Sequence, residues 1–83
     1  MMAFTGNQHT RYLIATRMME SICQRYNVPV QVLCSHYYVT VVLPERVELS
    51  SSILSEFSDI INRYTKFYYT LKLVNNHFEI RID

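Results

Sequence analysis

The sequence predicts an α+β fold in which two helices cover one face of a four-stranded antiparallel sheet. Two stretches carry apolar residues at helical spacing, and four stretches alternate in the manner of strands, in the order α-β-β-α-β-β. The two halves also share a short pattern, since HYYVTV at 36–41 is matched by HFEIRI at 77–82. We therefore interpret residues 1–83 as a single domain built from two α-β-β units, about 5–43 and 50–83.

The first helix is predicted to begin at a capping box. In it, the Thr5 hydroxyl accepts a hydrogen bond from the backbone three residues on, and the Gln8 side chain reaches back. Asn27 is the expected C-terminal cap, and Pro29 prevents the helix from continuing. The expected buried face recurs at spacings of three and four residues: Tyr12, Ala15, Met18, Met19, Ile22, Cys23 and Tyr26.

Two strands follow, over about 28–34 and 37–43. Pro29 is tolerated at the start of a strand or on an edge strand, which is consistent with a first strand at the edge of the sheet. The second strand is rich in β-branched and aromatic residues, as strands usually are. Cys23 and Cys34 both fall on apolar faces, so we expect buried thiols and a reducing compartment.

The second unit begins after a loop, with Ser52 as the expected N-cap of its helix. A strand over 67–74 and a strand over 77–82 are joined by Asn75–Asn76, and asparagine is the best substitute for glycine where two turn residues need positive φ. The helix is expected to bury Ile53, Phe57, Ile60, Ile61 and Tyr64, and the apolar face of the first of these strands consists of Phe67, Tyr69, Leu71 and Leu73.

Neither unit can bury its apolar face alone, so we expect the two hairpins to join into one sheet. Numbered by sequence, the expected strand order is 1-2-4-3, which is a circular permutation of the ferredoxin-like arrangement. The alternative is a swapped dimer, in which two chains exchange one α-β-β unit and build the same sheet twice.

The sheet face opposite the helices is the predicted partner-binding site. A solvated sheet face is usually polar, whereas this one is half apolar and carries two tyrosines, which are enriched at interfaces. The alternative is that tyrosine and threonine simply suit strands, and that scattered exposed apolar residues need no explanation. The predicted site residues are Leu33, Tyr38, Thr40, Val42, Tyr68, Thr70, Lys72 and Arg81.

The strand over 67–74 gives a second reason to expect a partner. It is long, contains no proline and carries one charge, Lys72. Because a bare edge of this kind invites pairing with another chain, we predict a homodimer formed across it.

The residues do not favour catalysis. His9, His36 and His77 are expected to lie apart, so no shared metal site is predicted. Gly6 is the only glycine, which leaves no phosphate-binding loop, and the serines at 50–52 are explained by helix capping. We expect neither an enzyme nor a cofactor.

The sequence therefore favours a small regulator or inhibitor that binds another macromolecule, with a protein as partner, through its open sheet face or sheet edge. The second hypothesis is single-stranded nucleic-acid binding through the same face, where Arg81 and Lys72 accompany Tyr38, although the net charge is only +1. A third is a ligand pocket between helices and sheet. No apolar run approaches the length of a membrane span and no signal-peptide pattern occurs, so we expect a cytoplasmic protein without a membrane partner.

Overall fold

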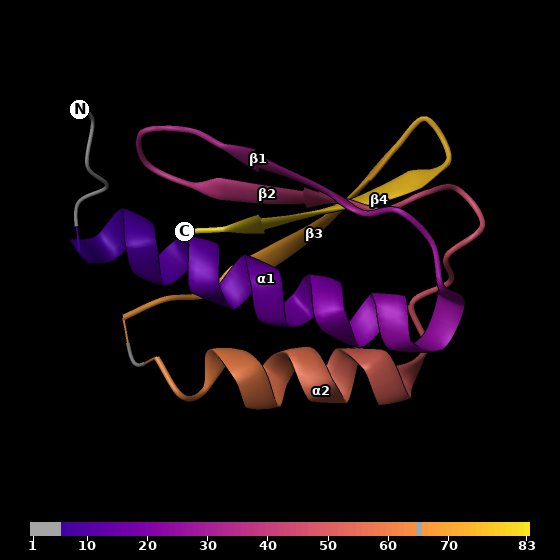
Figure 1. The fold of residues 1–83 in the computed structure, drawn as a ribbon, viewed down its shortest axis with the longest axis horizontal. Helices are drawn as coiled ribbons and strands as arrows, with labels where there is room; N and C mark the ends of the chain where they lie inside the picture. Colours follow the sequence, from indigo (N-terminus) through magenta and orange to yellow (C-terminus); the bar gives the residue numbers. More distant parts are fainter. Residues whose placement is uncertain (1–5, 65) are drawn as a thin grey trace.

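The helices and strands follow one another in the predicted order. The computed structural model describes residues 6–64 and 66–83. Both helices lie on the same side of the sheet (Figure 1), which confirms the predicted α+β class. The elements are α1 (Gly6–Tyr26), β1 (Gln31–Cys34), β2 (Val39–Val42), α2 (Ser51–Ile61), β3 (Tyr69–Val74) and β4 (His77–Ile82).

The sheet has the predicted order, β1-β2-β4-β3, and every neighbouring pair is antiparallel. Val41 of β2 lies opposite Val32 of β1 and Ile80 of β4, and Ile80 also lies opposite Leu71 of β3. The two central strands therefore come from different halves of the sequence. One chain supplies all four strands, so an exchange of units between chains is not needed to complete the sheet.

The core lies between the central strands and the helices. Val39, Val41, Ile80 and Ile82 are all fully buried, and they occupy corresponding positions in the two matched stretches. Each of these strands thus turns a β-branched pair toward the helices, as its alternating pattern predicts. The duplication of an α-β-β unit stays a prediction.

The buried face of α1 differs from the predicted one. Ile14 was not placed on that face, yet it is fully buried, whereas Tyr12 was placed on it and is 40% exposed. The reason is that α1 packs against both the sheet and α2, and Ile14 lies two helical turns before Ser21, whose hydroxyl donates to Glu56 of α2. The buried arc therefore extends toward α2, and Tyr12 falls at its outer limit.

Two predicted element ends are wrong. Ser50, rather than Ser52, is the N-cap of α2, because its hydroxyl accepts a hydrogen bond from the backbone N–H of Ile53 at 3.3 Å. The first strand begins at Gln31, so Pro29 precedes the strand instead of lying within it. A prolyl residue lacks the N–H that a ladder needs, which is consistent with pairing that starts only beyond it.

The predicted capping box of α1 depends on Thr5, which lies outside the described residues. Its other member, Gln8, is buried, and the side-chain amide donates a hydrogen bond to the carbonyl of Ser35 in the β1–β2 turn. Gln8 therefore ties the beginning of α1 to the first hairpin.

The asparagines behave as predicted. Asn27, at the end of α1, has a φ of 50°, and its N–H donates to the carbonyl of Cys23 at 3.0 Å. Asn75 and Asn76 have φ values of 48° and 71°, which is the backbone that a two-residue hairpin turn requires. Asparagine tolerates this region better than most residues.

The prediction of two buried thiols is wrong for Cys34. Both cysteines are free, but Cys34 is exposed and Cys23 is half-buried. Cys34 ends a four-residue strand at the edge of the sheet. Because an edge strand has a neighbour on one side only, its helix-facing side chains are less completely covered.

Candidate functional site

The predicted site residues share one face of the sheet, opposite the helices. The pairing of strands places Leu33, Thr40, Arg81 and Thr70 in a single row across all four strands. A neighbouring row consists of Gln31, Val42, Glu79 and Lys72. We call this surface the open face, since both helices lie on the other side (Figure 1).

Exposure varies across the open face. Leu33 is 47% exposed and Tyr68 is 62% exposed, and Thr70, Lys72 and Arg81 are exposed as well. The residues on the central strand and its start are half-buried: Tyr38, Thr40 and Val42. Tyr38 and Tyr68 each lie one residue before a strand, at the same end of the sheet.

Arg81 is held by two neighbours. Its guanidinium lies 4.0 Å from the centre of the Tyr38 ring, and its Nε donates to Asp83 Oδ1 at 2.9 Å. A cation–π contact of this kind contributes about 0.5–1 kcal/mol at an exposed site. The sequence reasoning missed Asp83, although its position two residues after Arg81 puts it on the same face of a strand.

The charges of the open face are balanced. Arg81 and Lys72 carry positive charge, while Asp83 and Glu79 carry negative charge. Glu79 also lies 3.0 Å from the Nε2 of His77, on the same face. A polyanion such as single-stranded nucleic acid would therefore meet no net positive surface here.

A shallow hollow of about 530 Å³ adjoins the open face near the β3–β4 turn. Aliphatic and prolyl side chains form most of its wall, and His77 and Glu45 provide ionisable groups. Its lining residues are Pro29, Val30, Gln31, Val42, Leu43, Pro44, Glu45 and His77. It lies at the end of the sheet and not between the helices and the sheet, where the sequence reasoning placed a candidate ligand site.

The outer side of β3 is a second uncovered surface. Leu71 is 39% exposed and Leu73 is 63% exposed, although both side chains lie on the helix-facing side of the sheet. In Figure 1 the β3–β4 turn lies far from α2, so the hairpin diverges from the helix layer. Strand alternation alone could not reveal this, because it gives the face of a residue but not the reach of the helix that covers it.

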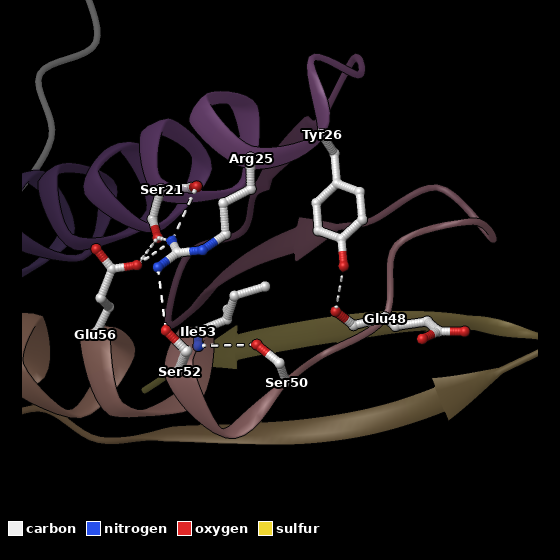
Figure 2. Close-up of polar contacts among 8 residues, drawn as sticks. All are labelled: Ser21, Arg25, Tyr26, Glu48, Ser50, Ser52, Ile53 and Glu56. Carbon is white, nitrogen blue, oxygen red and sulfur yellow. Dashed lines mark hydrogen bonds and ion pairs between the residues drawn. The ribbon is translucent and has the colours of Figure 1, made fainter.

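A polar cluster joins α1 to α2 (Figure 2). Ser21 Oγ donates to Glu56 at 2.8 Å, and Arg25 pairs with the same carboxylate while also contacting the Ser21 hydroxyl at 3.0 Å. The hydrogen bond from Ser21, followed by that from Arg25, lowers the pKa of Glu56 below its ordinary value of 4.5. The cluster therefore links the two helices through polar side chains at their exposed margin.

Residues 6–64 and 66–83 contain no evident metal centre. Within them, no group of three or more histidine, cysteine or acidic side chains is arranged to hold a metal ion. The sulfur of Cys23 lies 3.5 Å from the carbonyl of Val28, and Cys34 ends β1. Two uncovered surfaces with exposed apolar side chains are thus described, the open face and the outer side of β3.

Comparison with known proteins adds no relative. No family model, no curated protein and no solved structure matched this chain. Neither of the described helices is both long enough and apolar enough to cross a bilayer. Any functional conclusion therefore depends on the surfaces described above.

Proposed function

We infer that this chain is a non-enzymatic protein-interaction module, which acts as a regulator or inhibitor by covering a surface on another protein. The observation that carries this proposal is the open face, where apolar and aromatic side chains lie over a sheet that the helices leave uncovered. Leu33 lies on β1 at one side of the open face, and Tyr68, directly before β3, lies at the other side. Exposed patches of this composition on small proteins commonly mark contact sites.

The open face is suited to a protein partner in two further respects. Its centre is neutral overall, because Arg81 is paired with Asp83 and Glu79 lies beside Lys72. Interface cores are depleted in unpaired charge and enriched in tyrosine and arginine. The Arg81–Tyr38 stack is also preformed, so less side-chain entropy is lost when a partner covers it.

Single-stranded nucleic-acid binding remains the alternative, and it makes a different prediction. If the face bound a polyanion, affinity would fall steeply with salt and would be lost in Arg81→Glu. The neutral face argues against this, so we expect no binding of a random single-stranded oligonucleotide even at low salt. Fluorescence anisotropy with a labelled oligonucleotide measures it directly.

The test of the proposed function uses the side of the open face that is remote from β3. The double variant Leu33→Asp, Tyr38→Ala should lose capture of the partner from a lysate of the source cells, because it places a charge on the face and removes the stacked ring. Tyr37→Ala is the matched control, since Tyr37 is 79% exposed at the β1–β2 turn.

Capture is followed by quantitative mass spectrometry of the bound proteins. The expected result is a protein that is enriched by wild type and by Tyr37→Ala and is lost with the double variant. Equal enrichment by all three proteins, with circular dichroism showing that all are folded, would refute the open face as the binding site.

A further inference from the structure

The unpaired backbone of β3 follows from its pairing with β4. Tyr68 and Asp83 exchange both backbone hydrogen bonds, at 3.3 and 3.0 Å. Such pairs alternate along an antiparallel ladder, so the even-numbered residues of β3 bond to β4 and the odd-numbered residues direct both N–H and C=O outward. Within the described residues β3 pairs with β4 alone, and its outward residues are Tyr69, Leu71 and Leu73.

The same three residues expose apolar side chains or pack at the margin of the core. Leu73 is 63% exposed and Leu71 is 39% exposed, and Tyr69 is half-buried against Phe57. The unpaired backbone N–H and C=O groups and the exposed apolar side chains therefore lie along the same edge of the sheet. Water can form hydrogen bonds with the backbone groups, but it cannot cover the apolar side chains. A segment that binds this edge must therefore be an extended strand and must carry apolar side chains.

A second copy of β3 meets both requirements in one register. Two identical antiparallel strands related by a twofold axis perpendicular to the sheet keep their faces aligned only when residues of equal parity oppose each other. With Leu71 on the axis, Leu71 faces the partner's Leu71 and Leu73 faces the partner's Tyr69. All outward groups are then matched: three residues in each copy, each with one N–H and one C=O, form six interchain hydrogen bonds.

The neighbouring registers are less favourable. Centring the axis on Lys72 would place two ammonium groups directly opposite each other in the closer, non-hydrogen-bonded type of pair. Centring it on Thr70 would leave Leu73 opposite the partner's Phe67, whose N–H is already bonded to the carbonyl of Tyr64 at 3.2 Å. In the Leu71 register, Lys72 instead faces the partner's Thr70, and no like charges oppose each other.

We propose that two copies of this chain associate through antiparallel β3 strands centred on Leu71, forming a continuous eight-stranded sheet. This deepens the proposed function, on which its biological purpose rests, since the twofold axis keeps both open faces on the same side. The dimer therefore presents two copies of the binding face to one partner surface, and bivalent engagement raises the effective affinity without any new contact.

Charge substitutions at the axis test the register. In Leu71→Glu and in Leu71→Lys each copy brings a like charge to its own twofold mate, so each variant alone should dimerise at least roughly 100-fold more weakly than wild type. An equimolar mixture should recover a heterodimer, since the opposite charges then face each other. Native mass spectrometry and sedimentation analysis, under reducing conditions because Cys34 is exposed, resolve these species.

Two further variants keep the test decisive. Leu33→Asp places a charge on the opposite edge strand and should leave the dimer intact. Leu73→Pro should also prevent dimerisation, because it removes an outward N–H that the intrachain ladder does not use. It tests the same interface if the charged Leu71 variants do not fold. Circular dichroism establishes folding in each case.

Three results would overturn the inference. They are a wild-type chain that stays monomeric up to about 1 mM, a dimer indifferent to the changes at Leu71 and Leu73, and a charged pair that stays monomeric on mixing. A monomer that still captures its partner through Leu33 and Tyr38 would remove the dimer alone. A dimer that behaves as expected but captures nothing through that face would remove the proposed function alone.

Discussion

Truncating Phe57 to alanine tests whether α2 belongs to the same cooperative unit as the sheet. Phe57 is fully buried, and its ring meets Tyr69 of β3 edge-on, with 6.1 Å between the ring centroids. It is thus a side chain through which α2 contacts a strand directly. Removing the ring leaves a cavity between α2 and the sheet.

The expected loss is a large part of the total stability. Phe→Ala changes in protein cores cost about 3–5 kcal/mol, and an edge-on aromatic pair accounts for about 0.5–1.5 kcal/mol of this. A domain of 83 residues has an unfolding free energy of roughly 4–12 kcal/mol at about 0.05–0.15 kcal/mol per residue. Phe57→Ala should therefore lower Tm by at least about 12 °C. If the wild-type unfolding free energy lies at the lower end of this range, the variant is unfolded at room temperature.

Urea unfolding followed by circular dichroism measures the effect. Phe57→Leu, which keeps most of the apolar volume, should cost less than about 1.5 kcal/mol. Tyr37→Ala, at an exposed position, should lie within about 0.5 kcal/mol of wild type. A loss below about 1 kcal/mol for Phe57→Ala, with an unchanged m value, would show that the ring is not part of the core and would refute the packing of α2 described here.

Three further predictions follow from local structure. The hydrogen bond from Ser21 lowers the pKa of Glu56, so the stabilisation from that carboxylate is complete above pH 4.5 and is lost as the pH falls through the lower folded pKa. Glu56→Gln should therefore lower the urea midpoint at pH 7, and the two midpoints should converge in strongly acidic buffer; a constant difference would contradict the linkage. Ser50→Ala should cost about 1 kcal/mol by removing the cap of α2, and Ser52→Ala clearly less, as judged from their Tm values; the reverse ranking would show that Ser52 is the cap. Asn76→Val should cost about 1–2 kcal/mol because its φ is 71°, whereas Asn76→Gly should be tolerated, and equal thermal midpoints would argue against the positive-φ turn.

The architecture could be predicted because each of its signals is local. Alternation predicts one apolar face with Tyr37, Val39 and Val41 in the first hairpin and one with Phe78, Ile80 and Ile82 in the second. Val39, Val41, Ile80 and Ile82 are fully buried, whereas Tyr37, which lies in the β1–β2 turn, is 79% exposed. Two adjacent asparagines identified the β3–β4 turn. Strand order followed once two similar hairpins had to share one core, since neither can bury its face alone.

What the sequence could not supply was how far each element reaches. Ile14 is fully buried two helical turns before Ser21, whose hydroxyl donates to Glu56 of α2, and Leu71 and Leu73 are exposed on a hairpin whose turn lies far from that helix. Both facts depend on where α2 lies, and helical periodicity does not specify this. The choice of Ser50 over Ser52 is similar, because any of three consecutive serines can cap a helix until the entry of the chain is known.

The open face was inferred from the alternation of side chains along each strand. This alternation placed all of the predicted site residues on one side of the sheet. The same alternation puts Asp83, the partner of Arg81, on this face if the last strand is continued by one residue. The opposed charges that make the face neutral were thus present in the sequence. The tight stacking of Arg81 on Tyr38 was not, because side-chain conformation across two strands is decided by packing.

The central position of β4 has a consequence for biosynthesis. It is the last of the four strands to leave the ribosome, yet it pairs with both β2 and β3. Without β4, the β1–β2 hairpin has an unpaired edge on β2, and β3 has no neighbouring strand in the sheet. A variant in which β4 cannot pair would therefore populate an aggregation-prone intermediate with unpaired strand edges, and holdase chaperones should bind it far more than wild type.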